Sequence, residues 1–220
     1  MRMKALTFTL VVGVLLAFSQ RTHAQQVKKS DEIPKYEVGI DFTSLTLNES
    51  QTHPGAGGRF TYNWDRHIAL EAAGYFSPGK CASCEGEVTG HITEGLFGVK
   101  AGQRFKRFGI FGKVRPGFLR FSQGFFDLVP TGGTGPFPAT VVVRSRTDFA
   151  TDVGGVLEIY STRRCFFRFD AGVLFDRIGS RTFHSFTVDP VTGALSPIQF
   201  TAPSFTRRRF QFIAGVGFRF

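Results

Sequence analysis

Cysteine, tryptophan and long apolar runs are all scarce in this sequence of 220 residues. It contains three cysteines, one tryptophan and four tyrosines. Apart from the N-terminal region, no apolar run approaches the length of about 20 residues that a membrane-spanning helix requires. No segment shows the period of an amphipathic helix either. These absences exclude helical bundles and helical membrane proteins, so if the chain enters a membrane it does so as strands.

The three cysteines allow at most one local disulfide. Cys81 and Cys84 lie close together in a segment that contains Gly and Ser, whereas Cys165 is far away. In an oxidising compartment we expect Cys81 and Cys84 to form a disulfide and Cys165 to stay unpaired. A zinc site that adds His91 is the alternative, but it leaves the fourth ligand unnamed. We therefore expect neither a metal site nor a cofactor.

Phenylalanine and glycine are abundant, with 27 and 26 residues, and the formal net charge is +10. Many Phe and Gly residues suit a β-barrel that is apolar outside and tightly packed inside. An ordinary soluble β-protein, which also favours aromatic residues, is the alternative. The positive charge suits an anionic surface such as lipopolysaccharide phosphates or phospholipid headgroups.

The first 24 residues are predicted to be a cleaved signal peptide. Arg2 and Lys4 are basic, and the largely apolar run Leu6–Phe18, which is 13 residues long, is too short for a spanning helix. Thr22–Ala24 is a suitable cleavage site, and a cut after Ser19 is the alternative. Cleavage would leave a net charge of +7, because the removed segment carries three basic residues and no acid. An exported chain does not normally meet nucleic acid, so we expect no nucleic-acid partner.

Residues 25–34 are polar and are predicted to form a short periplasmic lead, which is followed by a barrel domain over residues 35–220. In this domain eight segments alternate between apolar and polar residues, the period of a strand with two different faces. The predicted strands are Lys35–Leu47, Gly58–Trp64, Ile68–Phe76, Thr93–Gln103, Phe108–Phe121, Asp148–Tyr160, Cys165–Asp176 and Phe210–Phe220.

The connections are predicted to alternate between long and short, with the short ones after the second, fourth and sixth strands. Residues 48–57 and 177–203 are expected to be loops. The stretch 122–147 is rich in Gly and Pro, but Val141–Val143 could extend the hairpin there. Pro116 is expected to cause a bulge or a local break, because proline cannot donate a backbone hydrogen bond.

Charged residues in the middle of the strands indicate which face points inward. The acids and bases balance, and glycines on the same faces leave room for long side chains that pair across a narrow lumen. The alternative is a solvated exterior face, with the aromatic residues around a ligand as in a lipocalin. The predicted lumen network consists of Glu71, Lys100, Lys113, Arg115, Asp152, Glu158, Arg168 and Asp170.

The last strand places Phe210, Phe212, Phe218 and Phe220 on one face. In water such a strand would be an aggregation-prone open edge, but it is stable if it closes against the first strand and its aromatic face meets lipid. Together with the signal peptide, the eight strands and the loop pattern, it resembles the small outer-membrane barrels of Gram-negative bacteria, of the OmpA transmembrane domain and OmpX type. The resemblance implies that Phe220 ends an assembly signal for the barrel-assembly machinery.

The fold expected from these features is an all-β, eight-stranded, antiparallel up-and-down transmembrane β-barrel with short periplasmic turns and long extracellular loops. We expect a monomer in the bacterial outer membrane, with outer-membrane lipid and lipopolysaccharide as partners and an unknown surface partner at the loops. The expected function is non-enzymatic, with a structural or surface-interaction role. The alternatives are a narrow pore for small solutes, a soluble periplasmic lipid-binding barrel and a lipid A-modifying enzyme.

Two groups of residues are candidates for chemistry or binding. His184 and Ser185 could suggest acyl transfer with Asp189, but no family motif surrounds them, so we expect no catalytic residue. Arg207, Arg208 and Arg209 lie at the outer end of the last strand and are predicted to contact lipopolysaccharide, since guanidinium groups bind phosphate well. Scattered charges that only add solubility are the alternative.

Overall fold

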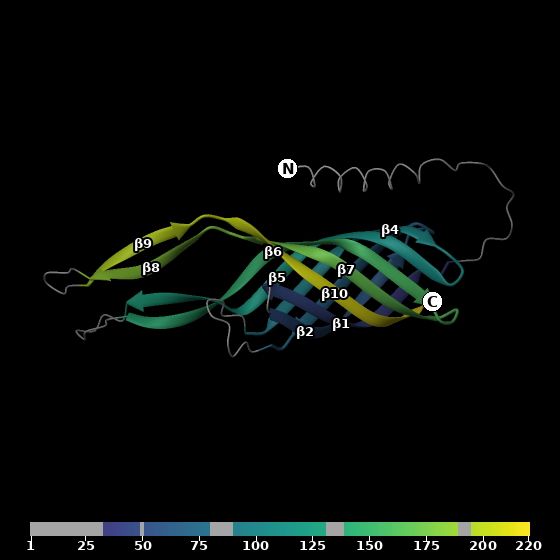
Figure 1. The fold of residues 1–220 in the computed structure, drawn as a ribbon, viewed down its shortest axis with the longest axis horizontal. Coiled ribbons are helices and arrows are strands. Elements are labelled where there is room, and N and C mark those ends of the chain that lie inside the picture. Colours follow the sequence, from purple (N-terminus) through teal and green to yellow (C-terminus); the bar gives the residue numbers. More distant parts are fainter. Residues whose placement is uncertain (1–32, 49–50, 80–89, 131–138, 189–194) are drawn as a thin grey trace. The chain divides into compact units, whose positions relative to one another are not determined.

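The computed structural model describes residues 33–48, 51–79, 90–130, 139–188 and 195–220. The predicted signal peptide, most of the lead, and both Cys81 and Cys84 lie outside the described residues. The described residues form ten strands, whose arrangement can be followed in Figure 1. They are β1 (Tyr36–Asn48), β2 (Gln51–Asn63), β3 (Ile68–Ser77), β4 (Ile92–Arg104), β5 (Phe108–Pro130), β6 (Ala139–Tyr160), β7 (Cys165–Ile178), β8 (Arg181–Val188), β9 (Leu195–Ala202) and β10 (Phe205–Arg219).

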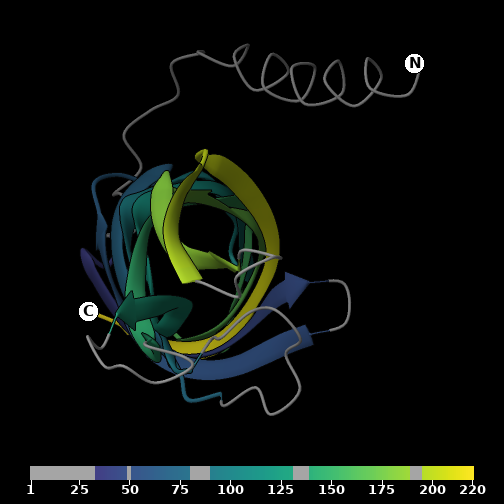
Figure 2. The same cartoon turned by 90° about the vertical axis from the view of Figure 1, so that its left-hand side faces the viewer.

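Eight of these strands form a closed antiparallel barrel in the order β1-β10-β7-β6-β5-β4-β3-β2, which appears as a ring in Figure 2. The first and last strands close it, with Glu37 opposite Arg219 and Leu45 opposite Gln211. The backbone N–H of Tyr36 donates to the Phe220 carbonyl at 3.1 Å, and the Phe220 N–H donates to the Tyr36 carbonyl at 2.9 Å. The predicted eight-stranded antiparallel barrel is therefore confirmed.

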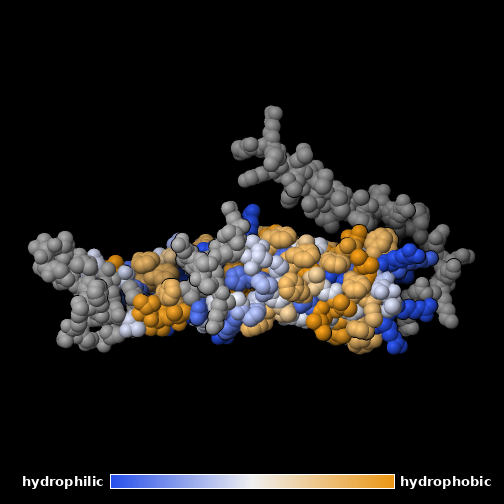
Figure 3. Space-filling model, turned by 60° about the horizontal axis from the view of Figure 1, so that its bottom comes forward, coloured by the Kyte–Doolittle hydropathy of each residue, from blue (hydrophilic) through white to orange (hydrophobic). Residues whose placement is uncertain are grey.

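Side chains alternate between the inside and the outside of the barrel wall, as the pleat of a strand requires. Every barrel strand presents large apolar side chains outward, and Ile40 is 79% exposed. The space-filling view in Figure 3 shows these residues as an apolar zone over the wall, with hydrophilic residues at its end. Within the described part of the chain, no helix is long and apolar enough to cross a membrane. One outward residue from each strand is Ile40, Phe60, Phe76, Phe97, Ile110, Phe149, Phe167 and Phe210.

One end of the barrel, here called the turn end, carries the three short connections 64–67, 105–107 and 161–164, where the sequence predicts short turns. The first is built around Asp65, whose carboxylate accepts hydrogen bonds from the backbone N–H groups of His67 at 2.6 Å and Ile68 at 2.7 Å. These bonds lower the pKa of Asp65 below its ordinary value, because they favour the ionised carboxylate.

At the opposite end, here called the hairpin end, the strands are longer than predicted. β2 begins at Gln51, so most of the expected loop 48–57 is strand, and Pro54 is tolerated because β2 pairs there with β1 only. The expected local break at Pro116 is present on one side of β5. The pairing of β4 with β5 is interrupted there, between Leu96–Gly117 and Val99–Val114, whereas Pro116 pairs in register with Thr151 of β6. The shift in register of β5 against β6 falls elsewhere, between Phe121 and Phe125.

The prediction of a loop over residues 177–203 is wrong, because most of this segment forms the β8–β9 hairpin. Arg181 pairs with Ala202 and Val188 with Leu195 in a separate two-stranded sheet. The rings of Phe183 and Phe200 stack with their centroids 5.2 Å apart, which is one reason why this hairpin forms. The β5–β6 pair likewise extends to Pro130 and Ala139, in the direction that Val141–Val143 indicated.

Candidate functional site

The lumen brings together all eight charged residues of the predicted network. Their side chains point inward from β3, β4, β5, β6 and β7, and all of them are buried. Burying a charge is costly unless a partner of opposite charge and hydrogen bonds compensate it. Each of the eight has at least one ion-pair partner within the group: Glu71, Lys100, Lys113, Arg115, Asp152, Glu158, Arg168 and Asp170.

Arg168 is the centre of the network. Its guanidinium Nη2 donates to Glu71 Oε2 at 2.9 Å, and Nη1 donates to the other oxygen of the same carboxylate. On its other side, Nε donates to Asp170 Oδ1 at 2.6 Å and Nη2 to Asp170 Oδ2 at 2.9 Å. One guanidinium therefore holds two carboxylates through paired hydrogen bonds, the geometry in which arginine binds carboxylates most strongly.

The other bases extend the network around this centre. Lys113 Nζ lies 2.8 Å from Asp152 Oδ2 and 3.2 Å from Asp170 Oδ2. Arg115 donates from Nε to Asp152 Oδ2 at 2.9 Å. These bonds tie β5 to both β6 and β7, so the charges hold neighbouring walls together as well as filling the space between them.

Lys100 connects the network to β1, because its Nζ bonds to Glu158 and also lies 3.3 Å from Glu37 Oε2. The sequence prediction missed Glu37, and it also missed the buried pair of Arg59 and Asp41. Their signal was present, since all three lie on the polar faces of their segments. A Cβ at Gly39 would come within 2.8 Å of the Arg59 guanidinium, so this glycine makes room for the ion pair.

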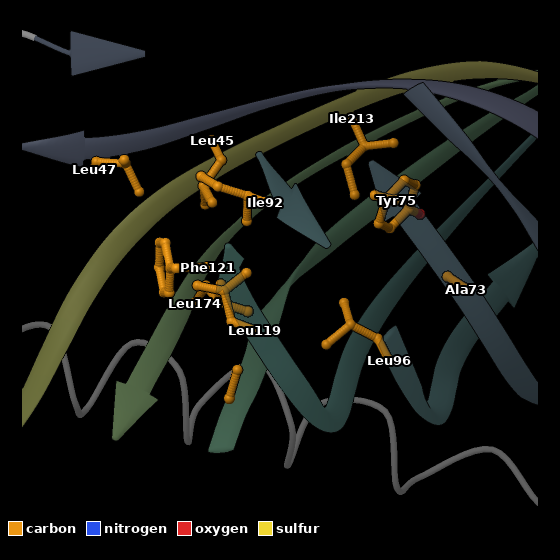
Figure 4. Packing of buried hydrophobic residues seen from close by; sticks show 11 residues of the cluster. Leu45, Leu47, Ala73, Tyr75, Ile92, Leu96, Leu119, Phe121, Leu174 and Ile213 are labelled. Carbon is orange, nitrogen blue, oxygen red and sulfur yellow. The ribbon is translucent and has the colours of Figure 1, made fainter. Parts of the chain in front are cut away.

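Toward the hairpin end a cluster of apolar side chains fills the lumen together with buried charges such as the pair of Arg209 and Asp176. Figure 4 shows how the apolar side chains point toward one another from several strands. Two arginines lie against the Phe121 ring of this group, with the Arg146 guanidinium carbon 4.3 Å and the Arg209 guanidinium carbon 5.5 Å from its centroid. The apolar cluster consists of Leu45, Leu47, Ala73, Tyr75, Ile92, Leu96, Leu119, Phe121, Ala150, Leu174 and Ile213.

The three consecutive arginines of the predicted lipopolysaccharide contact do not act together. Arg209 is buried in the lumen, where its Nη2 lies 2.9 Å from Asp176 Oδ2, so it cannot contact outer lipid. Arg207 is half-buried and lies on the same side of β10 as Arg209, at the mouth of the barrel. Only Arg208 faces outward, with its guanidinium carbon 5.9 Å from the centroid of the Phe175 ring. The physical reason is the alternation of a strand, which sends neighbouring side chains to opposite faces.

Two further arginines face outward at the hairpin end of the barrel wall. Arg177 of β7 pairs with Thr206 of β10, which places it diagonally next to Arg208 on the outer surface. Arg120 of β5 is exposed at the hairpin end of its barrel segment, and the sequence prediction did not include it. Outward Arg120, Arg177 and Arg208 are called here the arginine belt.

The four aromatic residues of the predicted assembly signal all lie on the outer face of the terminal segment. Phe210, Phe212, Phe218 and Phe220 are 53%, 40%, 55% and 66% exposed. Phe220 also joins the two ends of the chain's barrel through its backbone hydrogen bonds to Tyr36.

His184 and Ser185 do not form a pair of general base and nucleophile. They are consecutive residues of β8, so their side chains point to opposite faces of the hairpin. His184 Nδ1 lies 3.5 Å from Asp127 instead, and Asp189 lies outside the described residues. Within the described ranges, no group of three or more His, Cys, Asp and Glu residues is placed to hold a metal ion. Cys165 is a free cysteine at the start of β7.

The fold defines the class of protein as a closed antiparallel barrel of eight strands. The chain is similar in structure to three solved outer-membrane proteins. For Neisserial surface protein A (NspA) the identity is 14%, the TM-score is 0.46, and 86% of this chain and 100% of that chain are covered. For Ail, the attachment invasion locus protein of Yersinia pestis, the identity is 14%, the TM-score is 0.41, and 84% of this chain and 96% of that chain are covered. For the N-terminal β-barrel domain of Pseudomonas aeruginosa OprF the identity is 12%, the TM-score is 0.40, and 86% of this chain and 100% of that chain are covered. No protein-family model matches the chain, and no curated protein matches it.

Proposed function

We propose that the chain is a non-enzymatic outer-membrane protein of Gram-negative bacteria with a structural and surface-interaction role. The observation that carries this proposal is the inverted polarity of the barrel, with ion-paired charges inside and apolar side chains outside on all eight strands. In water this exterior would drive aggregation, whereas in lipid it is stabilised and the closed ring satisfies the backbone. A soluble lipid carrier would need the opposite arrangement.

The filled lumen favours a structural role over a pore. An eight-stranded barrel is only wide enough inside for side chains. Here the network around Arg168 and the apolar cluster around Phe121 both consist of buried side chains that occupy the lumen. We propose that no solute passes through it.

The arginine belt is proposed to bind phosphate groups of lipopolysaccharide. Arg120, Arg177 and Arg208 lie on three strands, next to outward aromatic residues such as Phe210. Each arginine can donate two parallel hydrogen bonds to one phosphate. If the arginine belt lies at the lipopolysaccharide phosphates, the turn end faces the periplasm. The hairpins β5–β6 and β8–β9 then reach outside the cell toward a surface partner.

The proposal also covers how the protein reaches and enters the membrane. The chain is exported through its cleaved signal peptide, and the barrel-assembly machinery reads the terminal aromatic segment. The barrel is a monomer, because each of its eight strands is paired on both sides and leaves no barrel edge for another copy.

Fractionation of cells followed by gel electrophoresis tests the proposal. We expect the mature protein in the outer-membrane fraction, and we expect its band to shift between unboiled and boiled samples, because a closed barrel resists detergent until it is heated. A protein that is soluble in the periplasm, with no shift on boiling, would overturn the proposal.

A further inference from the structure

A cavity of about 320 Å³ lies at the hairpin end, where β5 and β6 leave the barrel and the β8–β9 hairpin begins. This volume is at the lower end of the range for small-molecule sites. Its walls come from six strands, β5 to β10, and from the short links beside β8 and β9. The side chains that the argument uses are Phe125, Phe183, Phe205, Arg146, Arg181 and Arg207.

Positive charge gathers in this cavity. Among the described residues that line it there are three arginines and no acid. The buried carboxylate of Asp148, which does not line the cavity, forms ion pairs with two of these arginines. It lies 2.5 Å from Arg146 Nε and 3.1 Å from Arg181 Nη2. Burial, and then the positive charge of Arg146, lower the pKa of the Arg181 guanidinium. An anion in the cavity would offset this crowding of like charges.

Flat apolar surfaces stand beside these charges. The Arg181 guanidinium carbon lies 5.0 Å from the Phe125 ring centroid, and that of Arg207 lies 5.3 Å from the Phe205 ring centroid. Phe183 meets Phe125 edge to face, with centroids 6.0 Å apart. A planar ligand can therefore stack on a ring while its charged group meets a guanidinium.

The local backbone is shaped to form this cavity. The register of β5 against β6 shifts between Phe121 and Phe125, and such irregularities redirect the side chains of a strand. Gly124 lies within the shift, and a Cβ there would come within 2.2 Å of the Arg146 Cβ. The glycine thus lets β5 pack closely against Arg146 at the floor of the cavity.

We propose that this cavity binds a small aromatic anion, a ring system of about naphthalene size that carries one sulfonate or carboxylate. The inference goes beyond the proposed structural role, and it does not depend on the arginine belt, whose residues face the other side of the wall. The ligand enters from the aqueous side, because the cavity lies between hairpins that extend past the apolar wall.

Equilibrium dialysis of naphthalenesulfonate against the full barrel, folded in a non-ionic detergent at low ionic strength, tests this proposal. We expect saturable binding to one site, and we expect neutral naphthalenemethanol to bind about tenfold more weakly or worse. Arg181→Gln should weaken binding of naphthalenesulfonate by about tenfold, because it removes a guanidinium from the site.

Arg144→Gln is the matched control. It removes the same charge from β6, but Arg144 pairs with Asp127 at 3.0 Å and does not line the cavity, so affinity should stay within about twofold of the unsubstituted protein. Phe205→Leu keeps an apolar residue at an exposed position, which the fold tolerates, and should weaken binding several-fold through the lost ring face. Gel mobility before and after boiling confirms that each variant is folded.

Three results would overturn the inference. The first is the absence of saturable binding to the unsubstituted protein. The second is a failure of charge to matter. Naphthalenemethanol would then bind as tightly as naphthalenesulfonate, or Arg144→Gln and Arg181→Gln would lose the same affinity for naphthalenesulfonate. The third is binding of a polyanion such as dextran sulfate that naphthalenesulfonate does not displace, which would indicate an acidic polymer as the partner of this end of the barrel.

Discussion

Arg168 and Glu71 join opposite walls of the barrel. Their strands, β7 and β3, are four steps apart in either direction around the ring of eight, yet Arg168 Nη2 lies 2.9 Å from Glu71 Oε2. The two side chains therefore cross the centre of the lumen. Asp170 fixes the guanidinium from the other side through Nε at 2.6 Å. The barrel is therefore braced across its middle by an ion pair.

Replacing Arg168 with Met should destabilise the barrel strongly. The substitution leaves Glu71 and Asp170 buried without their main partner, and breaking a buried ion pair from one side costs about 3–5 kcal/mol. Unfolding in urea, followed by gel mobility of the detergent-folded protein, measures the loss. The double variant Arg168→Met, Glu71→Gln should recover part of the stability, because one of the two orphaned charges is removed. Arg164→Met in the exposed turn is the control and should change stability by no more than about 0.5 kcal/mol. Equal losses at Arg168 and Arg164 would contradict the account.

Two glycines on adjacent strands should respond in opposite ways to alanine. Gly98 of β4 points into the lumen, and a Cβ there would come within 2.1 Å of the Val114 carbonyl oxygen. Gly98→Ala should therefore destabilise the barrel by about 1–3 kcal/mol, because the backbone cannot move away easily. Gly74 of β3 points outward, and its nearest atom would be the Glu94 carbonyl oxygen at 3.9 Å. Gly74→Ala should be neutral or stabilise by about 0.4–1 kcal/mol. Urea unfolding compares the two, and the opposite order would show that the assignment of inner and outer faces is wrong.

Neutralising the arginine belt should weaken the contact with lipopolysaccharide. Arg120, Arg177 and Arg208 are replaced together by Gln, and each arginine near an anionic surface contributes roughly 1 kcal/mol. The amount of lipopolysaccharide that co-purifies with the folded barrel should fall by about tenfold or more. The matched control removes three charges at the turn end, with the substitutions Arg66→Gln, Lys106→Gln and Arg107→Gln. If both triple variants retain the same amount of lipopolysaccharide, the belt is not its binding site.

Phe220→Ala should impair assembly in cells more than folding in the test tube. The backbone hydrogen bonds of Phe220 to Tyr36 survive the substitution, so refolding into detergent should be nearly unchanged. If the assembly machinery reads the aromatic ring, the level of heat-modifiable protein in the outer membrane should fall several-fold. Phe167→Ala, which removes an exposed ring from β7, is the control and should assemble normally. If Phe220→Ala lowers the refolding yield in detergent as much as the level of assembled protein in cells, Phe220 acts only as a structural residue.

Much of the fold follows from the two-residue alternation, which predicts the number of barrel strands and their closure by the first and last. The alternation fails at the hairpin end, because the β8–β9 hairpin and the outer parts of β2, β5 and β6 extend past the closed ring and are paired on one side only. There Pro54 and the glycines around it indicate a loop, although β2 still pairs with β1 through this segment.

The inward charges could also be recognised from the sequence, but their partners could not. Which acid meets which base depends on the tilt and stagger of strands that are far apart in the chain, as for Arg168 and Glu71. The arginine triplet is a different case. The alternation that places Phe210 outward also places Arg208 outward and Arg209 inward, so the sequence already contained the correction.

The conductance of the purified, full barrel in a planar lipid bilayer tests the central claim most directly. The account predicts no stable current steps, because Arg168, Glu71 and the apolar cluster around Phe121 fill the lumen. The double variant Arg168→Ala, Glu71→Ala, inserted in the same way, shows whether clearing the central ion pair admits ions. Stable open channels from the unsubstituted protein would contradict the sealed lumen and would make the narrow pore the better description.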